Sequence, residues 1–359
     1  MSNAHAINSK PARPAGSCGP GRPAAADQME TVMTRMTTLM TRRTACTAFA
    51  VAGIALALAA CSTANGATPG ADIVTSPVGA ATSAPAAAVP QGSYVALGDS
   101  YTAGPDIPDQ TGATAGCDQS TSSYPHLVAQ SLRLDLTDMS CSGATIADLS
   151  AAQLTGDGSN PAQLSPLSAA TSLVTLGIGG NDVDWSAVIT RCTELDLVPV
   201  LIPGGTAASS TPCQDYYTSG RTDQIRQKTQ AAAGQLADAL TQVRHRAPHA
   251  RVYVVGYPDL LPAAGGTCGH TLGVTQGDAA FLNDEELQLN SALRQDAQAA
   301  GATYVDTYGP SIGHDACSDP ASRWIEPLLP ASPAAPLHPN AAGEQGMADA
   351  VSRAITGNG

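Results

Sequence analysis

Short hydrophobic segments separated by amphipathic ones dominate the chain after residue 93. Five of the hydrophobic segments have the length of buried strands, at residues 94–97, 134–139, 172–178, 251–256 and 303–307. Helical spacing of apolar residues occurs between or after them, at 124–131, 146–154, 183–190, 222–246, 279–300 and 341–355. Strands that alternate with helices in this way predict an α/β fold, with a parallel sheet that helices cover on both faces.

The first 60 residues have a different pattern, which predicts an export signal. Residues 1–39 are polar and rich in Pro and Gly, then in Met, and we expect them to be disordered or to precede the true start. Within 40–60, Arg42 and Arg43 come before an apolar run at 45–60 that ends in small residues. A basic end, a short apolar core and small residues before a cleavage point are typical of a signal peptide, and the run is short for a membrane-spanning helix.

Cys61 is a candidate lipidation site. The sequence Leu-Ala-Ala-Cys at 58–61 resembles the lipobox of bacterial lipoproteins, in which the Cys thiol carries lipid and becomes the first mature residue. Lipid chains would anchor the protein with about 0.8 kcal/mol per buried methylene. The alternative is an ordinary secretory signal cut near Ala60. Residues 61–92 contain almost only Ala, Thr, Ser, Pro, Gly and Val, which predicts a flexible tether before a domain at 93–359.

We therefore expect an exported protein, held at the cell surface by Cys61 or secreted if that residue carries no lipid. Six of the 17 basic and two of the 30 acidic residues precede Cys61, so the remainder has 11 basic against 28 acidic side chains and a formal charge of −17. Such a surface is unsuited to nucleic acid or to anionic lipid head groups. The expected partner is a small-molecule or lipid substrate, the expected state is a monomer, and membrane contact is expected only through the anchor.

Six cysteines follow the predicted leader and tether: Cys117, Cys141, Cys192, Cys213, Cys268 and Cys317. An even number in an oxidising compartment predicts three disulfides, for which 15 pairings are open. Pairing neighbours in sequence order would close three loops, each with a stabilisation of roughly a few kcal/mol. No Cys-x-x-Cys pair occurs, and the cysteine spacings do not resemble a zinc site. No dinucleotide-binding or phosphate-loop motif in the sequence supports a nucleotide site.

Four loop positions carry the candidate chemistry. Ser100 lies in a Gly-Asp-Ser turn after the first strand, Gly143 follows the second strand, Asn181 lies in a Gly-rich turn after the third, and His338 precedes the last helix. Each has an ordinary interpretation by itself: Ser100 and Asn181 as helix caps, Gly143 as a turn glycine, and His338 as one of seven histidines, with His314 as its rival. Open α/β folds place their chemistry at these strand ends.

Taken together and in this order, the four positions resemble the GDSL/SGNH hydrolase family, whose four name residues they match. The resemblance covers residues 94–355, and Tyr101 stands where the GDSL name has Leu. The cysteine spacing is similar to that of secreted actinobacterial lipases and esterases of this family, which supports pairing in sequence order. The resemblance implies a flavodoxin-like three-layer α/β/α domain that hydrolyses carboxylic esters without a metal or an organic cofactor.

The residue types agree with that chemistry. A serine hydroxyl is a poor nucleophile unless a base takes its proton, and imidazole titrates in the right range. His338 would take the proton of Ser100 and return it to the leaving alcohol. The backbone N–H groups of Ser100 and Gly143 and the side chain of Asn181 would form the oxyanion hole, in which each donor is worth about 100- to 1000-fold in rate.

The residue that orients His338 departs from the family pattern, which has an Asp three residues before the histidine. That position is Ala335, and the nearest upstream carboxylate is that of Glu326. Some family members resemble this chain in using a backbone carbonyl instead. We therefore expect the Ala335 carbonyl to accept the imidazole N–H, which leaves a Ser-His dyad. The alternative is that Asp306 or Asp315 folds in to serve.

The leading hypothesis is thus an exported serine esterase or lipase that acts on acyl glycerols or short-chain acyl esters. The same residues would serve a carbohydrate acetylesterase, and a surface binding module could retain the fold without turnover. Trp185 is a candidate wall of the site, and the alternative is a helix residue that packs on the core. Pocket depth depends on the loops expected at 104–123, 191–220 and 257–279, whose composition does not indicate an acyl chain length.

Overall fold

The computed structural model of the protein describes residues 89–90, 92–201, 209–220, 222–262, 268 and 271–357. The predicted leader, Cys61 and nearly all of the predicted tether lie outside the described residues. Across the described ranges, no helix is both long and apolar enough to cross a membrane.

Five parallel strands form the central sheet in the order β2-β1-β5-β6-β7. Their bounds are Ser93–Gly98 for β1, Asp135–Asp138 for β2, Thr171–Gly177 for β5, Arg251–Val255 for β6 and Thr303–Val305 for β7. Each lies within or beside a predicted strand. The order is that of flavodoxin-like sheets, in which the strand order reverses between β1 and β5 while all strands stay parallel. Because ligands of open α/β sheets bind beyond the carboxyl ends of the strands at such a reversal, Gly98 and Gly177 mark the expected site.

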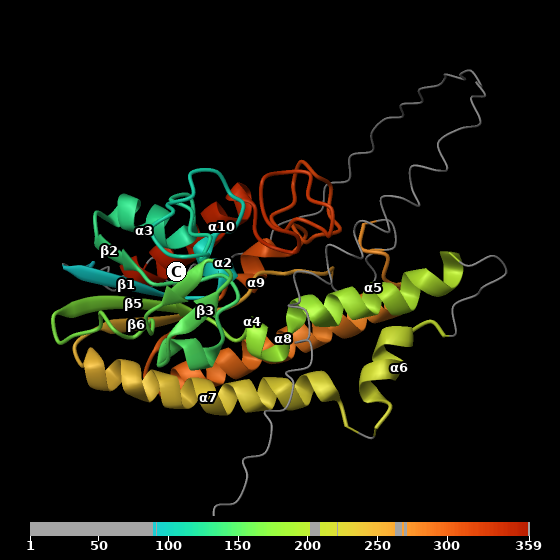
Figure 1. Ribbon diagram of the computed structural model, residues 1–359, viewed down its shortest axis with the longest axis horizontal. Coiled ribbons are helices and arrows are strands. Elements are labelled where there is room, and N and C mark those ends of the chain that lie inside the picture. The colour runs from blue at the N-terminus through green and yellow to red at the C-terminus, as the bar shows by residue number, and fades with distance from the viewer. Residues whose placement is uncertain are drawn as a thin grey trace, which may run out of the picture. The chain divides into compact units, whose positions relative to one another are not determined.

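Helices cover both faces of the sheet and produce three layers (Figure 1). One face carries α3 (Tyr124–Leu132) and α10 (Ala341–Thr356). The other carries α7 (Gln224–Arg246) and α8 (Gln276–Ala299). All four helices were predicted, and the arrangement confirms the three-layer α/β/α fold.

Two hydrophobic cores lie on the two faces of the sheet because successive strand residues point in opposite directions. On β1, Tyr94 and Ala96 pack in the core that includes Val351 of α10, whereas Val95 and Leu97 pack in the core that includes Leu240 of α7. Burial on both faces explains why β1 is an almost continuous hydrophobic run. The rigid sheet therefore fixes where its carboxyl ends present polar loops.

The remaining elements are short, except for one helix, and most surround the carboxyl edge of the sheet. They are α2 (Ser100–Ala103), the 3-10 helix η1 (Ile146–Leu149), β3 (Gln153–Thr155), β4 (Gly158–Asn160), α4 (Gly180–Val183), α5 (Trp185–Leu201), α6 (Pro212–Thr218) and α9 (Tyr308–Ser311). The segment 191–220, expected to be a loop, is largely the end of α5 and α6.

The predicted helix at 146–154 is wrong. A capping box between Thr145 and Asp148 starts a single 3-10 turn, and the chain then forms the β3-β4 hairpin around Gly158, whose φ is +152°. Ile146 and Leu149 are buried as the helical pattern required, but Leu154 is 81% exposed. Two glycines at the turn favour the hairpin over a continued helix.

Among the described residues there are three disulfides, Cys117–Cys141, Cys192–Cys213 and Cys268–Cys317. The pairing follows sequence order, as the family resemblance implied. The first bond joins the segment after α2 to the loop after β2, and the second joins α5 to α6. The third joins the segment after β6 to the segment after α9. Each bond therefore constrains a loop near the carboxyl edge of the sheet.

Candidate active site

Ser100 occupies the first residue of α2, directly after β1. Asp99 is the N-cap of this helix, and its Oδ1 accepts a hydrogen bond of 2.9 Å from the Tyr101 backbone N–H. The helix ends after one turn because Gly104 adopts the left-handed conformation, with φ +77°. A buried amide, that of Gln163, bonds both the N–H and the carbonyl of Gly98 at 2.8 and 2.9 Å. The turn therefore holds Ser100 at a fixed place beyond the sheet.

His338 reaches Ser100 from the other end of the domain. Its Nε2 lies 2.7 Å from Ser100 Oγ, although 238 residues separate the two in sequence. The loop that carries it is held by the Tyr101 hydroxyl, which donates to the Leu337 carbonyl at 2.5 Å. The Tyr101 ring also lies against the imidazole, with centroids 5.0 Å apart. Ser100 and His338 thus have the contact that a nucleophile and its base require.

The group that orients the imidazole is the carbonyl of Pro336, which lies 2.7 Å from His338 Nδ1. The expectation of Ala335 was wrong by one residue. The Ala335 carbonyl instead accepts the backbone N–H of His338 at 3.2 Å, which closes a turn in which Leu337 has φ +64°. This turn leaves the next carbonyl, that of Pro336, facing the ring. A backbone carbonyl therefore orients the imidazole of His338.

Neither alternative carboxylate contacts His338. Asp306 accepts the backbone N–H groups of Tyr308 and Gly309, and Asp315 accepts that of Cys317. Both carboxylates therefore serve turns in the chain after β7. The rival histidine, His314, stacks on Trp324 with centroids 4.8 Å apart, and its Nδ1 bonds the carbonyl of Ser322.

The protonation of His338 follows from its surroundings. Burial lowers the pKa of the imidazole below its ordinary value, and the hydrogen bond to the Pro336 carbonyl acts in the opposite direction. That bond requires a proton on Nδ1, which leaves the lone pair of neutral Nε2 facing the Ser100 hydroxyl. His338 is therefore prepared to accept a proton.

Gly143 lies in the loop after β2 and Asn181 in the short helix α4 after β5, and these two strands flank β1. Within the described residues no hydrogen bond occupies the N–H groups of Ser100 and Gly143. Gly143 has φ +75°, a conformation that favours glycine. Asn181 Nδ2 donates one hydrogen to the Ala144 carbonyl at 2.9 Å, which leaves its second hydrogen for a ligand. Asp182 accepts the Ile146 N–H, so the two loops support each other.

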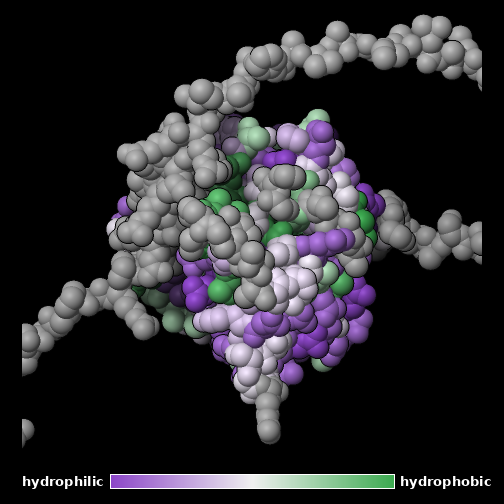
Figure 2. Space-filling model, turned by 90° about the vertical axis from the view of Figure 1, so that its right-hand side faces the viewer, coloured by the Kyte–Doolittle hydropathy of each residue, from purple (hydrophilic) through white to green (hydrophobic). Residues whose placement is uncertain are grey.

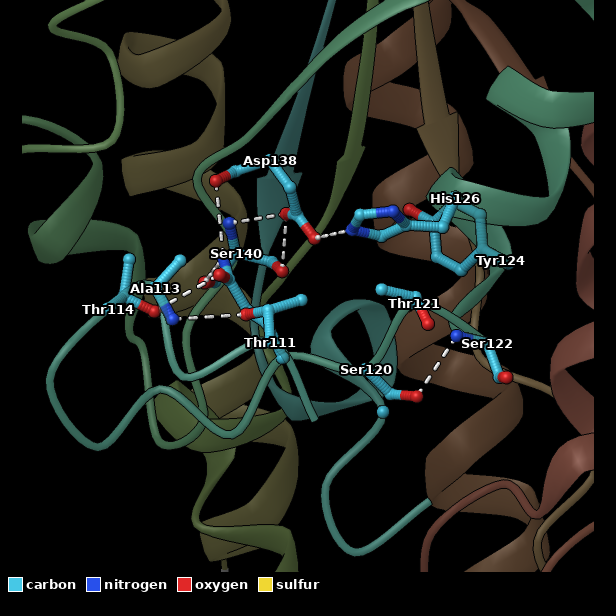
Figure 3. Close-up of polar contacts among 12 residues, drawn as sticks. Thr111, Ala113, Thr114, Ser120, Thr121, Ser122, Tyr124, His126, Asp138 and Ser140 are labelled. Carbon is cyan, nitrogen blue, oxygen red and sulfur yellow. Dashed lines mark hydrogen bonds and ion pairs between the residues drawn. The ribbon is translucent and has the colours of Figure 1, made fainter. Parts of the chain in front are cut away.

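The loop that presents Gly143 is anchored at its start. Ser140 donates its N–H and its hydroxyl to Asp138 Oδ1, at 2.9 and 2.7 Å, and His126 Nε2 of α3 lies 3.4 Å from Asp138 Oδ2 (Figure 3). The disulfide Cys117–Cys141 follows at once, and Ser142 donates its N–H to the Cys117 carbonyl at 3.0 Å. These contacts limit the freedom of the backbone just before Gly143.

A small pocket opens beside Ser100 and His338. Trp185 lines it, as expected for a wall of the site, together with Ser186 and Leu260. Glu286 of α8 also lines it and is buried, with its Oε2 accepting the Leu260 N–H at 3.2 Å. Burial, with nearby Asp259 and Asp315, raises the pKa of Glu286 well above its ordinary value. On the face of the molecule that Figure 2 shows, hydrophobic residues lie among polar ones.

Sequence reasoning missed several of these residues. Tyr257 lies two residues after β6 and lines the pocket, and its place at a strand end next to β5 was a usable signal. Glu286 and Gln163 had no such signal, because nothing in the sequence shows which side of a helix or turn meets a distant loop. In the described part of the chain, no group of three or more His, Cys, Asp or Glu side chains could hold a metal ion.

Comparison with known proteins adds independent information. Residues 96–345 match the model of the GDSL-like lipase/acylhydrolase family. Lipase 2 of Streptomyces coelicolor is 44% identical to the chain over 270 residues, which are 75% of this chain and 88% of that protein. An esterase of Streptomyces scabiei is 30% identical over 280 residues, 71% and 80% of the two chains. The crystal structure of phospholipase A1 from Streptomyces albidoflavus NA297 superposes with a TM-score of 0.59 at 29% identity, covering 73% of this chain and 98% of that one.

Proposed function

Because the chain belongs to the GDSL-like lipase/acylhydrolase family and is a carboxylic ester hydrolase, we propose that it works through a dyad of Ser100 and His338. The observation that carries the proposal is the 2.7 Å contact between His338 Nε2 and Ser100 Oγ. A neutral imidazole at that distance can accept the hydroxyl proton as the oxygen attacks.

In the first half-reaction Ser100 Oγ bonds to the ester carbonyl carbon while its proton moves to His338 Nε2. The positive charge that forms on the imidazole is stabilised by the Pro336 carbonyl dipole at Nδ1. His338 then gives the proton to the leaving alcohol, and the carbon–oxygen bond of the ester breaks. An acyl group remains on Ser100, and water releases it as a carboxylic acid by the same steps.

Three donors are proposed for the oxyanion: the N–H groups of Ser100 and Gly143 and the side chain of Asn181. This assignment is supported because all three groups lie at the ends of neighbouring strands and each has a hydrogen that is free to bond a ligand. Fixed donors stabilise the developing charge more than water does because they need no reorganisation. The proposed substrates are acyl glycerols or short-chain acyl esters.

The test is hydrolysis of p-nitrophenyl esters of graded chain length by the purified protein. Wild type should release nitrophenol, and Ser100→Ala should lose about 10,000-fold or more in kcat. Equal rates for the two proteins would contradict the proposed nucleophile. The chain-length profile separates a lipase from an acetylesterase, because an acetylesterase should lose activity beyond the shortest acyl groups.

We further propose export and attachment of the protein to the membrane through lipid on Cys61. The support is the basic, apolar and small-residue pattern that ends in Leu-Ala-Ala-Cys at 58–61. Cys61→Ala should move the protein from the membrane fraction to the medium, because alanine has no thiol group to carry the lipid. Retention of the variant in the membrane fraction would refute the anchor.

A further inference from the structure

The hydroxyl of Tyr257 joins two loops of the site. It accepts the backbone N–H of Gly180 at 2.8 Å and donates to Asp99 Oδ2 at 2.5 Å. Gly180 directly precedes Asn181, and Asp99 directly precedes Ser100. One oxygen atom therefore bridges the turn that carries the proposed nucleophile and the turn that carries a proposed oxyanion donor.

The bridge uses three neighbouring strands. Asp99 follows β1, Gly180 follows β5 and Tyr257 follows β6, and these strands are adjacent in the sheet. Asp99 follows β1 directly, but Gly180 lies three residues beyond the end of β5 and Tyr257 two residues beyond the end of β6, so the sheet does not by itself fix where these two residues lie. A bond between these residues sets a distance that the sheet alone leaves open.

Tyr257 is held both through its backbone and through its ring. Its backbone N–H donates to Asn290 Oδ1 at 2.8 Å, and its carbonyl accepts from Asn290 Nδ2 at 2.9 Å. Its ring packs edge-on against Tyr101, with centroids 5.2 Å apart. A Cβ at position 180 would lie 3.1 Å from the Tyr257 hydroxyl, so the backbone approaches closely there. These contacts, including those to Asn290 of α8, fix the position of the Tyr257 hydroxyl.

Capping of α2 does not account for the bridge. The N-cap role of Asp99 uses only Oδ1, which accepts the Tyr101 N–H. Oδ2 is the atom that faces Tyr257, and Asp99 is 1% exposed, so the phenol is the partner of this oxygen in the folded protein. Likewise, the Gly180 N–H lies at the first position of α4, where no helix carbonyl is available to it. Both partners thus depend on Tyr257 for a hydrogen bond.

We propose that Tyr257 is a positioning residue that sets the separation between Ser100 and the Asn181 side chain, so that the oxyanion formed on Ser100 meets the Asn181 amide. This inference rests on the proposed function. The hydroxyl touches no reacting atom, and its effect passes through Asn181. It should therefore act on the transition state, in which the oxyanion exists, and leave ground-state binding nearly unchanged.

The test compares Tyr257→Phe with wild type, with Tyr94→Phe as a matched control. Tyr94 is also buried, but its hydroxyl bonds Thr175 within the sheet, away from the site. Tyr257→Phe should lower kcat about 10-fold and leave KM within about 2-fold. Affinity for a boronic acid, which forms a tetrahedral adduct with the serine, should weaken by the same factor. Tyr94→Phe should change none of these values.

A double-mutant cycle separates positioning from general damage. In an Asn181→Ala background the donor is gone, so adding Tyr257→Phe should cost less than about 2-fold. Asp99→Asn keeps one oxygen for the cap of α2 but replaces the acceptor of the Tyr257 hydrogen with an NH2 group that can only donate. It should give a similar loss in kcat that does not add to that of Tyr257→Phe. This second variant keeps the test decisive if Tyr257→Phe folds poorly.

Two results would overturn the inference: wild-type kcat in Tyr257→Phe, or a 10-fold loss that persists in the Asn181→Ala background. Failure of the proposed function would look different, because Ser100→Ala would then keep the activity of wild type. An inactive Ser100→Ala with a fully active Tyr257→Phe refutes the role of Tyr257 alone.

Discussion

The Nδ1 atom of His338 lies 2.7 Å from the carbonyl oxygen of Pro336. The imidazole that faces Ser100 is therefore oriented by the backbone of its own loop. A carbonyl fixes the tautomer as a carboxylate does, but it carries only a dipole and stabilises the imidazolium less. The geometry of the loop that presents this carbonyl thus sets the orientation of the proposed base.

The first prediction concerns the two carboxylates, those of Asp306 and Asp315, that were the alternatives for orienting His338. Asp306→Asn and Asp315→Asn should each keep kcat within about 3-fold of wild type, because neither carboxylate contacts His338. A triad aspartate would instead cost about 10,000-fold. Steady-state kinetics with a p-nitrophenyl ester measures this, with His338→Ala as the inactive control. A loss of several thousand-fold in either Asn variant would show that a carboxylate completes the site.

A second prediction concerns the hydrogen bond between Tyr101 and the loop that carries His338. The Tyr101 hydroxyl donates to the Leu337 carbonyl, and Leu337 has a φ of +64° that its side chain disfavours. Tyr101→Phe removes this bond and should lower kcat about 5- to 10-fold, which corresponds to a typical hydrogen bond of about 1 kcal/mol. Melting temperature should fall by only a few degrees. An unchanged kcat would mean that the loop holds its shape without Tyr101.

Much of this arrangement was visible in the sequence, for physical reasons. The strands were predicted because burial on both faces demands continuous apolar runs, as in β1. Ser100, Gly143, Asn181 and His338 were singled out because each lies beside such an element and because the four together resemble the GDSL/SGNH family.

What the sequence did not indicate depends on side-chain direction and loop geometry. The carbonyl of Pro336, and not that of Ala335, faces the imidazole because of the turn at Leu337. Composition does not specify the geometry of such a turn. The helix expected at 146–154 failed because apolar Ile146 and Leu149 fit one helical turn as well as several. Tyr257 was overlooked because its partners, Asp99 and Gly180, are distant in the chain.

The third prediction separates two disulfides that close loops of similar length. Cys117–Cys141 and Cys192–Cys213 span 24 and 21 residues, so loss of either should lower the free energy of unfolding by about 3 kcal/mol. Only the first anchors the loop that presents Gly143. The double variant Cys117→Ser/Cys141→Ser should therefore also lose about 10-fold in kcat, whereas Cys192→Ser/Cys213→Ser serves as its matched control. Equal losses of kcat in the two double variants would contradict this assignment.

A fourth prediction concerns stability against pH. Burial raises the pKa values of Asp99, Asp196, Asp259 and Glu285 to about 7, so these groups bind protons in the folded state that the unfolded chain has released. Their contribution to stability is complete below their unfolded pKa values near 4 and is lost as pH rises through about 7. The melting temperature should therefore fall between pH 5 and pH 8.

Asp196→Asn provides the control for that prediction. The amide oxygen can still accept the Thr275 N–H, which lies 2.7 Å from Asp196 Oδ2, but the side chain no longer titrates. The variant should thus show a shallower fall in melting temperature over the same range. His338 acts in the opposite direction, because its lowered pKa favours the neutral folded form as pH rises. A melting temperature that rises from pH 5 to pH 8 would refute the assignment.

The central claim is that Ser100 is the nucleophile and that His338 activates it. The most direct measurement is mass spectrometry of the protein after reaction with a fluorophosphonate, which bonds covalently to an activated serine. One adduct per chain is expected on the peptide that contains Ser100, with none in Ser100→Ala and labelling slowed at least about 1,000-fold in His338→Ala. An adduct on any other residue, or ester hydrolysis that survives in Ser100→Ala, would contradict the account.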